Sequence, residues 1–329
     1  MKRILIIQTA FIGDVILATP LVEKLHEAYP EYIIDFLLRK GNEGLFANHP
    51  YINKIYIWNK KEDKYRDLFN ILMKVRQIRY DYIINLQRFL STGIFTILSG
   101  SKIKIGFKKN PLSLFFSQSY SHIINKNNKK LHEVDRNLIL LTRMVNIDKR
   151  ILPRLYPSKE DYSNVYEQNE YITISPTSVW YTKQYPAVKW IEVINLIPAN
   201  FKIFILGGTS DIIACNWIKT QSKHQNISVM AGKLNLLESA ALMKNARMNF
   251  VNDSAPLHLA SSVDAPVTAI FCSTVPSFGF GPLSDISRVI ETSENLKCRP
   301  CGLHGYKKCP EIHFRCADIP ADVIVNNVL

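Results

Sequence analysis

The chain has 329 residues, of which 47% are hydrophobic and 21% are charged, and its formal net charge is +13. This length favours two domains, and the composition excludes disordered, collagen-like and disulfide-scaffold proteins. Asp14 and Glu23 interrupt the N-terminal apolar segment, and no later apolar run reaches the ~18–20 residues that span a bilayer. We therefore expect a cytoplasmic protein that is not integral to a membrane.

Short apolar runs typical of buried parallel strands alternate with helical patterns along the whole chain. The first series of predicted strands is Arg3–Ala10, Tyr32–Leu38, Lys54–Trp58, Tyr80–Leu86 and Lys102–Phe107, with helices at Val15–Tyr29 and between Lys64 and Arg79. The second series of strands begins at Tyr171, Lys202, Ile227, Met248 and Val267, with helices after Asn235 and at Pro256–Ser262. Two such series predict an α/β protein with two doubly wound, Rossmann-like sheets.

The stretch from Lys149 to Glu170 is polar and lacks periodicity, so it marks the predicted domain boundary. We expect an N-terminal domain over residues 1–160 and a C-terminal domain over residues 161–329, and we allow for the last residues packing back onto the first domain. Ligands of open α/β sheets bind outside the carboxyl ends of the strands. Two domains of this kind predict that both face a central cleft that holds the ligands.

The excess of positive charge lies in the first half of the chain. Residues up to Asp161 include 27 Lys and Arg against 15 Asp and Glu, whereas the remainder has 14 against 13. No acidic residue occurs between Asp81 and Glu133, where the basic residues are Arg88, Lys102, Lys104, Lys108, Lys109, Lys126, Lys129 and Lys130. A field of this sign attracts a polyanion such as nucleic acid, an anionic membrane or a phosphorylated lipid. The other interpretation is a lysine-rich composition that serves only solubility, and no nucleic-acid-binding motif is present.

The first predicted strand ends in a loop that contains Gly13 and Asp14. The glycine allows a sharp turn, and the carboxylate then lies at the mouth of the cleft, at the helix N-terminus. The alternative is that Asp14 only caps the following helix, which stabilises it by ~1 kcal/mol. The GxGxxG fingerprint of dinucleotide-binding proteins is absent.

Two loops of the second series carry groups that suit a phosphorylated ligand. Thr177, Ser178 and Lys183 follow the strand at Tyr171, and their hydroxyls and ammonium can bind a diphosphate, although such a lysine is often only solvated. Gly207-Gly208 permits close backbone approach, and Asp211 could hold ribose hydroxyls. A simple turn with a helix cap explains these last residues equally well.

The segment Asp253-Ser254-Ala255-Pro256-Leu257-His258 leads from a strand into a helix, with proline in the first turn. Free N–H groups and the helix dipole favour phosphate at such a position, and Ser254 adds a hydroxyl. The alternative is a capped helix with a partly buried His258.

The six cysteines fall into two groups. Cys215 and Cys272 lie in apolar segments, where small buried side chains are expected. The other four follow the pattern C-x2-C-x7-C-x6-C and are Cys298, Cys301, Cys309 and Cys316. Our first interpretation is reduced thiols that pack the final helix across the domain junction, and structural zinc or disulfides formed on oxidation are the alternatives. We expect this cluster away from the reacting groups because it follows the last predicted strand.

Taken in order, these segments resemble the ADP-heptose:lipopolysaccharide heptosyltransferase family (glycosyltransferase family 9), nearer to its heptosyltransferase II type. The resemblance covers almost the whole chain and rests on Gly13-Asp14, the spacing from Pro176 to Lys183, Gly207-Gly208, the block Asn252–His258, the CxxC run from Cys298 and His132–Arg136. It implies the GT-B architecture. The departures are Ala255 in place of glycine, Cys272-Ser273-Thr274 in place of a Gly-Pro-Thr/Ser turn, and Asp211 in place of glutamate, all on the donor side.

The resemblance implies an inverting transfer of heptose from ADP-heptose to the inner core of lipopolysaccharide, with Kdo-lipid A or heptosyl-Kdo-lipid A as acceptor. Asp14 would accept the proton of the attacking hydroxyl, and Lys183 would stabilise the leaving ADP, so we expect neither a metal nor a cofactor. The candidate donor-binding residues are Thr177, Ser178, Lys183, Gly207, Gly208, Asp211, Asp253, Ser254, Ala255, Pro256, Leu257 and His258 in the second domain. The candidate acceptor-binding residues are Gly13, Arg88, Lys108, Lys109 and Arg136 in the first.

The basic first half suits an anionic acceptor and predicts peripheral contact with the cytoplasmic face of the inner membrane. The expected partners are the ADP-sugar and the lipopolysaccharide precursor, without nucleic acid, and we expect a monomer. Two alternatives are a GT-B transferase of another nucleotide-sugar for a surface polysaccharide, and a non-catalytic protein that binds anionic lipid or nucleic acid.

Overall fold

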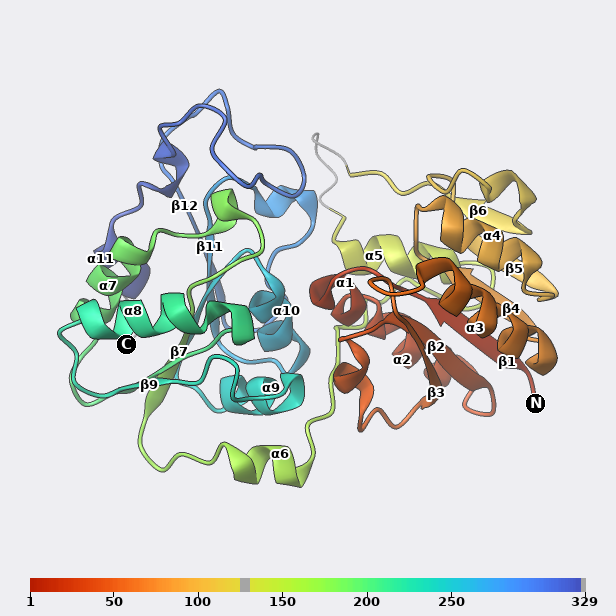
Figure 1. Cartoon of the computed structure of the whole chain (residues 1–329), viewed down its shortest axis with the longest axis horizontal. Helices are drawn as coiled ribbons and strands as arrows, with labels where there is room; N and C mark the ends of the chain where they lie inside the picture. The colour runs from red at the N-terminus through yellow and green to blue at the C-terminus, as the bar shows by residue number, and fades with distance from the viewer. Residues whose placement is uncertain (125–130, 327–329) are drawn as a thin grey trace. The chain divides into compact units, whose positions relative to one another are not determined.

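The computed structural model describes residues 1–124 and 131–326 and separates into two compact units (Figure 1). The first unit comprises Met1–Ile124 and Leu131–Tyr156, and the second begins at Pro157. The division falls inside the polar stretch Lys149–Glu170. The stretch from Arg88 to Lys130, called here the basic segment, includes Lys126, Lys129 and Lys130, which lie outside the described residues.

The first unit is built on a six-stranded sheet with the order β3-β2-β1-β4-β5-β6. Its strands are β1 (Arg3–Ile7), β2 (Ile33–Arg39), β3 (Ile52–Trp58), β4 (Tyr82–Asn85), β5 (Ile103–Phe107) and β6 (Gln118–Tyr120). All adjacent pairs are parallel. The order reverses at β1, which pairs with β2 on one side and β4 on the other, so a ligand site is expected where β1 and β4 end.

The helices of the first unit are α1 (Ile12–Ile16), α2 (Thr19–Ala28), α3 (Lys64–Ile78), α4 (Leu90–Leu98) and α5 (Glu133–Leu138), with short 3-10 turns at Glu43–Phe46, Ser113–Phe115 and Ile139–Leu141. Helix α3 buries the apolar residues that its sequence spacing predicted, namely Leu68, Ile71, Leu72 and Val75. They pack against Leu5, Tyr56 and Trp58 of the sheet.

The single helix predicted over Val15–Tyr29 is wrong in its bounds, because two helices occupy this region. Helix α1 ends at Ile16, and α2 begins at Thr19 with Pro20 in its first turn. Proline has no N–H and its ring clashes with the carbonyl four residues earlier, so it starts a new helix more readily than it continues one. As a result Asp14 lies inside α1 and not in the loop before a helix.

The second unit has a six-stranded parallel sheet with the order β12-β11-β10-β7-β8-β9. Its strands are β7 (Tyr171–Ser175), β8 (Lys202–Ile205), β9 (Ile227–Val229), β10 (Asn249–Asn252), β11 (Val267–Phe271) and β12 (Ser287–Glu291). Its helices are α6 (Lys159–Asn164), α7 (Ala187–Leu196), α8 (Ile212–Gln221), α9 (Leu236–Lys244), α10 (Ala255–Ser262) and α11 (Ala321–Val325), with 3-10 turns at Tyr181–Lys183, Thr209–Asp211, Pro276–Phe278 and Arg315–Ala317. Both doubly wound sheets of the predicted α/β fold are confirmed.

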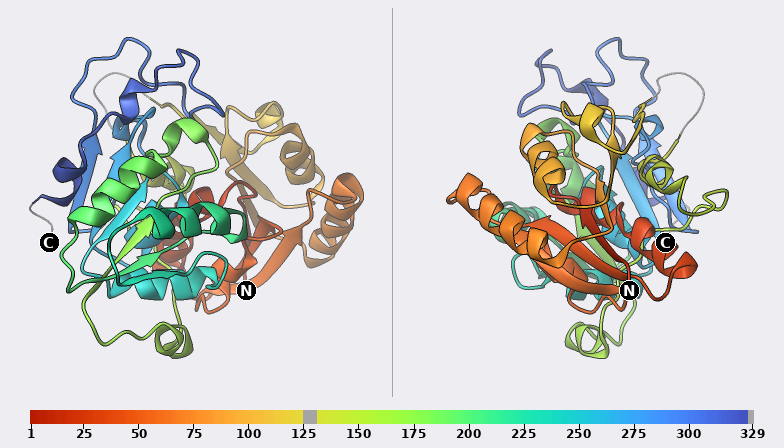
Figure 2. Two further views of the ribbon diagram at one scale, coloured as in Figure 1. Left: turned by 60° about the vertical axis from the view of Figure 1, so that its left-hand side comes forward. Right: turned by 90° about the vertical axis from the view of Figure 1, so that its right-hand side faces the viewer.

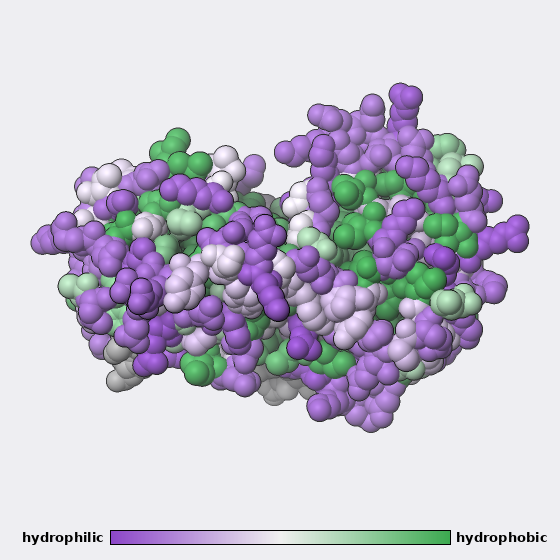
Figure 3. Space-filling view, turned by 90° about the horizontal axis from the view of Figure 1, so that it is seen from below, coloured by the Kyte–Doolittle hydropathy of each residue, from purple (hydrophilic) through white to green (hydrophobic). Residues whose placement is uncertain are grey.

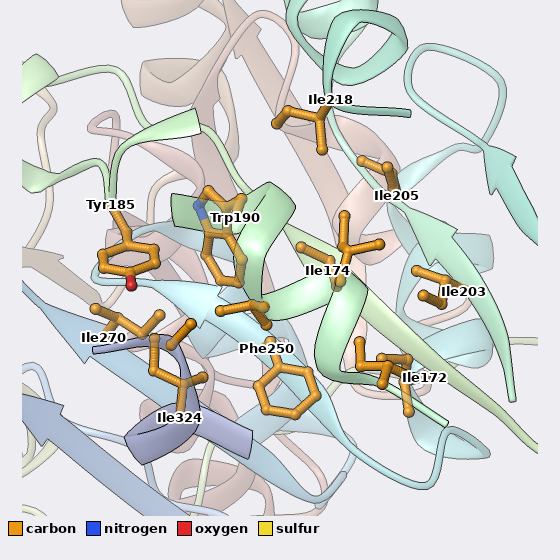
Figure 4. Close-up of a cluster of buried hydrophobic side chains, with 14 of the residues drawn as sticks. Ile172, Ile174, Tyr185, Trp190, Ile203, Ile205, Ile218, Phe250, Ile270 and Ile324 are labelled. Atoms are coloured by element: carbon orange, nitrogen blue, oxygen red, sulfur yellow. The ribbon is translucent and has the colours of Figure 1, made fainter. Parts of the chain in front are cut away.

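The second sheet carries helices on both faces. Figures 1 and 2 show α7 and α8 on one side of its strands and α9 and α10 on the other. The core between α7 and the sheet contains the fully buried Trp190 and Ile174, with Phe250 and Tyr185 around them (Figure 4). The Tyr185 ring meets Trp190 edge-on at 5.4 Å between ring centroids, a favourable aromatic arrangement.

The described end of the chain packs on the second unit, and the contact with the first domain that we allowed for stays a prediction. Helix α11 contacts α7, and Cys316, Ile319 and Ile324 belong to the core of the second sheet. Burial of these apolar side chains explains the placement, because each Å² of apolar surface removed from water stabilises the fold by roughly 25 cal/mol.

On the face drawn in Figure 3, hydrophilic residues predominate and hydrophobic ones lie among them. Two of the most exposed apolar residues are neighbours, Leu114 at 92% and Phe115 at 67% exposed, whereas Phe116 is buried. In the part of the chain that the structure describes, every helix is too short or too polar to cross a membrane.

Candidate active site

The first candidate site lies at the carboxyl ends of β1 and β4, where the strand order reverses. The chain leaves β1 through Gln8 and Thr9 towards α1, and it leaves β4 through Gln87 and Arg88. The side chains of Gln8 and Gln87 are buried and hydrogen-bonded to each other, which joins the two loops. This contact places the Asp14 helix and the Arg88 loop at the same edge of the sheet.

Asp14 is the third residue of α1, and its Oδ2 accepts a hydrogen bond from the Phe11 N–H at 3.1 Å. It therefore caps the helix, as the alternative interpretation held, but from inside the first turn. Gly13 is buried beside it, while Asp14 itself is half-buried. A carboxylate that is both oriented by a backbone N–H and open to solvent can also accept a proton from a bound hydroxyl.

Several of the predicted cationic residues lie within electrostatic reach of Asp14. Although Lys109 as a residue is exposed, its ammonium lies 4.9 Å from the centre of the Phe107 ring. The pKa of Lys109 is lowered to about 8, chiefly because the surrounding protein desolvates it; Arg88 and Arg136 contribute to the lowering, whereas Glu133 and Asp14 oppose it. The structure thus brings Asp14, Lys109, Arg88 and Arg136 into one charged region of the first unit.

The remaining predicted acceptor residues differ in how accessible they are. Arg88 and Lys108 are exposed, and Arg88 lies over the Phe89 ring at 5.5 Å. Arg136 is only 1% exposed, and it donates to Glu133 at 2.7 Å and to the Leu131 carbonyl at 2.6 Å. Because its guanidinium already has these partners, Arg136 holds α5 in place, and its contact with an acceptor stays a prediction.

Two cations at this edge of the sheet were missed by the sequence analysis, Arg39 and Lys60. Lys60 donates to the Thr9 carbonyl at 2.6 Å, and desolvation, with the charges of Arg39 and Lys64, lowers its pKa to about 8. Burial lowers the pKa of Arg39 while Asp14 opposes the shift, and its buried Nε has no hydrogen-bond partner among the described residues. Arg39 and Lys60 lie within two residues of the end of a predicted strand. A search of the loops that follow predicted strands, which found Asp14, could therefore have found both.

The second candidate site lies at the carboxyl ends of β7 and β10, the reversal point of the second sheet. Lys183 ends a short turn after β7, and its Nζ lies 2.7 Å from Oδ2 of Asp253, which follows β10. The same oxygen accepts from the Thr274 hydroxyl at 2.5 Å. Asn252 joins the two loops, because its Oδ1 accepts from the Tyr185 N–H at 2.9 Å.

Asp253 therefore orients Lys183, and its own contact with the donor stays a prediction. The carboxylate is 4% exposed and both its neighbours are hydrogen-bond donors. A second anion, such as a diphosphate, is repelled by a carboxylate but attracted by the ammonium that it holds.

The helix that starts after Asp253 presents backbone groups and few side chains to a ligand. Ser254 precedes α10 with an extended backbone, and Ala255 and Pro256 are half-buried. Leu257 is fully buried and His258 is 6% exposed, so both side chains pack in the interior, and the predicted contact of these two residues with the donor stays a prediction. The N–H groups of the first turn remain suited to phosphate.

The Gly207-Gly208 turn follows β8 and is closed by Asp211, whose Oδ2 accepts from the Gly208 N–H at 2.8 Å. A Cβ at Gly207 would lie 2.8 Å from Cβ of Asp211, so the close turn requires glycine there. This is the helix-cap interpretation, and a contact with ribose stays a prediction. Thr177 and Ser178 are half-buried in the loop after β7.

The C-terminal cysteine segment lies against the second candidate site, and the distance of its thiols from the reacting groups stays a prediction. All six cysteines are free thiols, and across residues 1–124 and 131–326 no group of three or more His, Cys, Asp or Glu side chains could hold a metal ion. The Tyr306 N–H donates to Thr182 Oγ1 at 2.7 Å, next to Lys183. The chain returns from β12 over the carboxyl edge of its own sheet, which local sequence patterns do not reveal.

Two doubly wound sheets, each with charged groups at its reversal point, define a two-domain α/β protein. The model of "Glycosyltransferase family 9 (heptosyltransferase)" matches residues 68–307. The chain belongs to this family, and the predicted family membership is confirmed.

Known proteins are similar over most of this chain. Lipopolysaccharide heptosyltransferase 3 of Escherichia coli is 28% identical over 80% of this chain and 82% of its own length. Lipopolysaccharide heptosyltransferase 1 of Campylobacter coli is 26% identical over 89% and 90%. The solved structure of E. coli ADP-heptose lps heptosyltransferase II is 21% identical, covers 98% of this chain and 96% of its own, and has a TM-score of 0.78. This likeness confirms the GT-B fold.

Proposed function

We propose that this protein is an inverting glycosyltransferase that moves heptose from ADP-heptose to the inner core of lipopolysaccharide. The observation that carries the proposal is the Lys183 ammonium, held by Asp253 beside the N-terminus of α10 where the second sheet reverses. This is a site for a diphosphate leaving group. The names of the similar proteins support both the sugar and the acceptor.

In this mechanism Asp14 takes the proton of the acceptor hydroxyl while that oxygen attacks the anomeric carbon from the face opposite the leaving group. The bond to ADP breaks, and the diphosphate carries away the electron pair. Lys183 and the N–H groups of α10 stabilise the developing charge, so we expect transfer without a metal requirement. The proposal requires both candidate sites to act on one pair of substrates.

A binding screen with ADP-, UDP-, GDP- and CMP-sugars tests the donor. We expect ADP-heptose to stabilise the protein against heat more than the other nucleotide-sugars, because binding to the folded state alone raises the melting temperature. Preference for a different nucleotide would favour the alternative of another GT-B transferase. Absence of binding to all four would remove the catalytic proposal.

The acceptor is proposed to bind at the cations around Asp14, which predicts a pH dependence. Lys60 and Lys109 both have a pKa of about 8, so each is about nine-tenths protonated at pH 7 and about one-tenth at pH 9. Affinity for the anionic acceptor should therefore fall as the pH rises from 7 to 9, by up to about tenfold for each lysine in contact. Calorimetric titration at both pH values measures the change.

Arginine keeps its charge throughout this range. Lys109→Arg should make the pH dependence shallower, whereas Lys74→Arg, on the exposed face of α3, should leave it unchanged. An acceptor affinity that is the same at pH 7 and pH 9 in the unmodified protein would exclude these lysines from the acceptor site.

A cytoplasmic position at the inner-membrane surface is also proposed, with the basic segment and the exposed pair Leu114 and Phe115 as the contact. Binding to vesicles of mixed zwitterionic and anionic lipid should fall more than about tenfold between 0.05 and 0.5 M salt, because screening weakens exposed charges. Vesicle sedimentation measures the bound fraction. Salt-independent binding, or no binding, would leave the positive charge as a feature of composition.

Apolar insertion is tested separately. Replacing both Leu114 and Phe115 by serine should weaken vesicle binding by about tenfold, since each side chain would lose part of its transfer free energy. Phe69→Ser is the matched control, because Phe69 is 59% exposed on α3 of the same unit. Equal losses for the two variants would show that Leu114 and Phe115 make no special contact.

A further inference from the structure

The segment Arg299–Tyr306, called here the 299–306 segment, holds two loops of the second candidate site at once. It follows β12 and belongs to the cysteine-containing part of the chain. One of the two loops is the turn after β11, which carries Thr274, the hydrogen-bond donor to Asp253. The other is the turn that carries Lys183.

At the turn after β11, four successive carbonyls bind the beginning of the segment. The Arg299 guanidinium donates to the carbonyls of Phe271 at 3.0 Å, Cys272 at 2.6 Å and Thr274 at 2.7 Å. The Cys301 N–H donates to the Ser273 carbonyl at 2.8 Å. These bonds fix the backbone that aims the Thr274 hydroxyl at Asp253.

Glu291 at the end of β12 supports this arrangement, because its carboxylate pairs with Arg299 at 2.6 Å. The arginine side chain is 12% exposed. With a carboxylate partner and three carbonyl acceptors, the hydrogen-bonding capacity of the guanidinium is largely used. Because the guanidinium is planar and rigid, the side chain loses little conformational freedom for each hydrogen bond formed.

At the Lys183 turn, the end of the segment forms a second set of contacts. The Thr182 N–H donates to the Tyr306 carbonyl at 3.1 Å, and the Tyr306 N–H donates to Thr182 Oγ1 at 2.7 Å. The buried Ser273 hydroxyl lies 3.0 Å from the same Oγ1, so the two loops meet here. Thr182 is 1% exposed.

Gly305 packs closely against the Lys183 turn. Its φ is +71°, and a Cβ at this position would lie 2.8 Å from Thr182 Oγ1, 3.0 Å from Lys183 Cγ and 3.2 Å from Ser273 Oγ. Such distances are shorter than normal contacts, so only glycine lets the segment pack this closely against the lysine stem.

We propose that the 299–306 segment positions the Lys183 ammonium for the donor diphosphate, with Arg299, Gly305 and Tyr306 as positioning residues. The proposal rests on the proposed function of Lys183. A lysine side chain otherwise has many rotamers, and holding its stem and its Asp253 partner removes that cost before the ligand binds. In this way the segment promotes heptosyl transfer through Lys183, without contacting either substrate itself.

Gly305→Ala tests the proposal, with Gly302→Ala as the matched control. Both glycines have positive φ, at +71° and +65°, so both substitutions strain the backbone alike, but a Cβ at Gly302 meets only Tyr306 atoms at 3.4 Å or more. We expect Gly305→Ala to weaken ADP binding by about tenfold and Gly302→Ala by less than about twofold. Equal effects of the two would overturn the proposal.

A double-mutant cycle shows whether Gly305 acts through Lys183. In the Lys183→Ala background, Gly305→Ala should change ADP affinity by less than about twofold, because the group that it positions is absent. If the loss remains about tenfold in that background, the segment has only a general structural role and the proposal is wrong.

A measurement without ligand separates this proposal from the proposed function. Acetylation of Lys183, followed by peptide mass spectrometry, should be faster in Gly305→Ala than in Gly302→Ala or the unmodified protein. Should the unmodified protein bind no nucleotide, the proposed function fails, yet this labelling still decides whether the segment holds Lys183. Unchanged labelling would contradict the proposal.

If Gly305→Ala does not fold, Thr182→Val serves in its place. Valine keeps the shape of threonine but removes the oxygen that accepts from the Tyr306 N–H. It should reproduce the expected loss of ADP affinity and the faster labelling, and Thr182→Ser, which keeps the hydroxyl, should restore both. A Thr182→Val variant equal to the unmodified protein would also overturn the proposal.

Discussion

Asp14→Asn is expected to lower kcat by ~10²–10⁴, the usual range for loss of a general base. The amide cannot accept the proton of the acceptor hydroxyl, but its oxygen can still accept the Phe11 N–H that Asp14 binds at 3.1 Å. Folding and ADP binding should therefore change little. Steady-state kinetics, a thermal melt and an ADP titration measure the three quantities.

The matched control for this variant is Asp161→Asn. Asp161 is the third residue of the short helix α6, as Asp14 is of α1, and its Oδ2 accepts from the Ser158 N–H at 2.7 Å. Removing a helix-capping charge should cost the two variants similar stability, about 1 kcal/mol or less. If Asp14→Asn retained more than half of the normal activity, Asp14 would not be the general base and would only cap α1.

Lys183→Ala is expected to weaken ADP binding by ~10–100-fold, the size of a hydrogen bond to a charged group, and to slow transfer by ~10²–10³, as for other groups that stabilise a leaving charge. The loss has two parts. The diphosphate loses its cation, and it then meets the Asp253 carboxylate without the ammonium that lies 2.7 Å away. Adding Asp253→Asn should therefore recover part of the ADP affinity.

Lys189→Ala is the control for Lys183. Lys189 lies on α7 and pairs with Asp318 at 2.8 Å on the surface, so its removal should change neither binding nor transfer by more than about twofold. Similar losses in the two variants would indicate a general electrostatic effect of positive charge and would exclude a specific contact of Lys183 with the diphosphate.

The sequence predicted the parts of the site that depend on a strand and the loop directly after it. Asp14, Lys183 and Asp253 all follow predicted strands, and parallel strands bring such loops to one edge. Strand β12 was not predicted, because Ser287, Arg288 and Glu291 interrupt its apolar pattern. β12 lies at the edge of the sheet, and most of its side chains are exposed. Over five residues, the resulting alternation of polar and apolar side chains is too short to recognise in the sequence.

Other features depend on contacts between distant parts of the chain. The role of Asp253 follows from its pairing with Lys183 across 70 residues of sequence, and the 299–306 segment reaches Thr182 across more than a hundred. Burial of Leu257 and His258 depends on how α10 packs against its sheet. Composition and spacing carry no information on these contacts, so the sequence did not reveal that Asp253 pairs with Lys183.

The proposed heptosyl transfer is tested by incubating the purified protein with ADP-heptose and an inner-core acceptor. Mass spectrometry then measures the mass of the acceptor. Kdo-lipid A and heptosyl-Kdo-lipid A are supplied separately, with Asp14→Asn as the control. The proposed reaction predicts that one acceptor gains a single heptosyl residue, that ADP is released in equal amount, and that Asp14→Asn catalyses the transfer far more slowly. Transfer from a different nucleotide-sugar only, or undiminished transfer by Asp14→Asn, would contradict it.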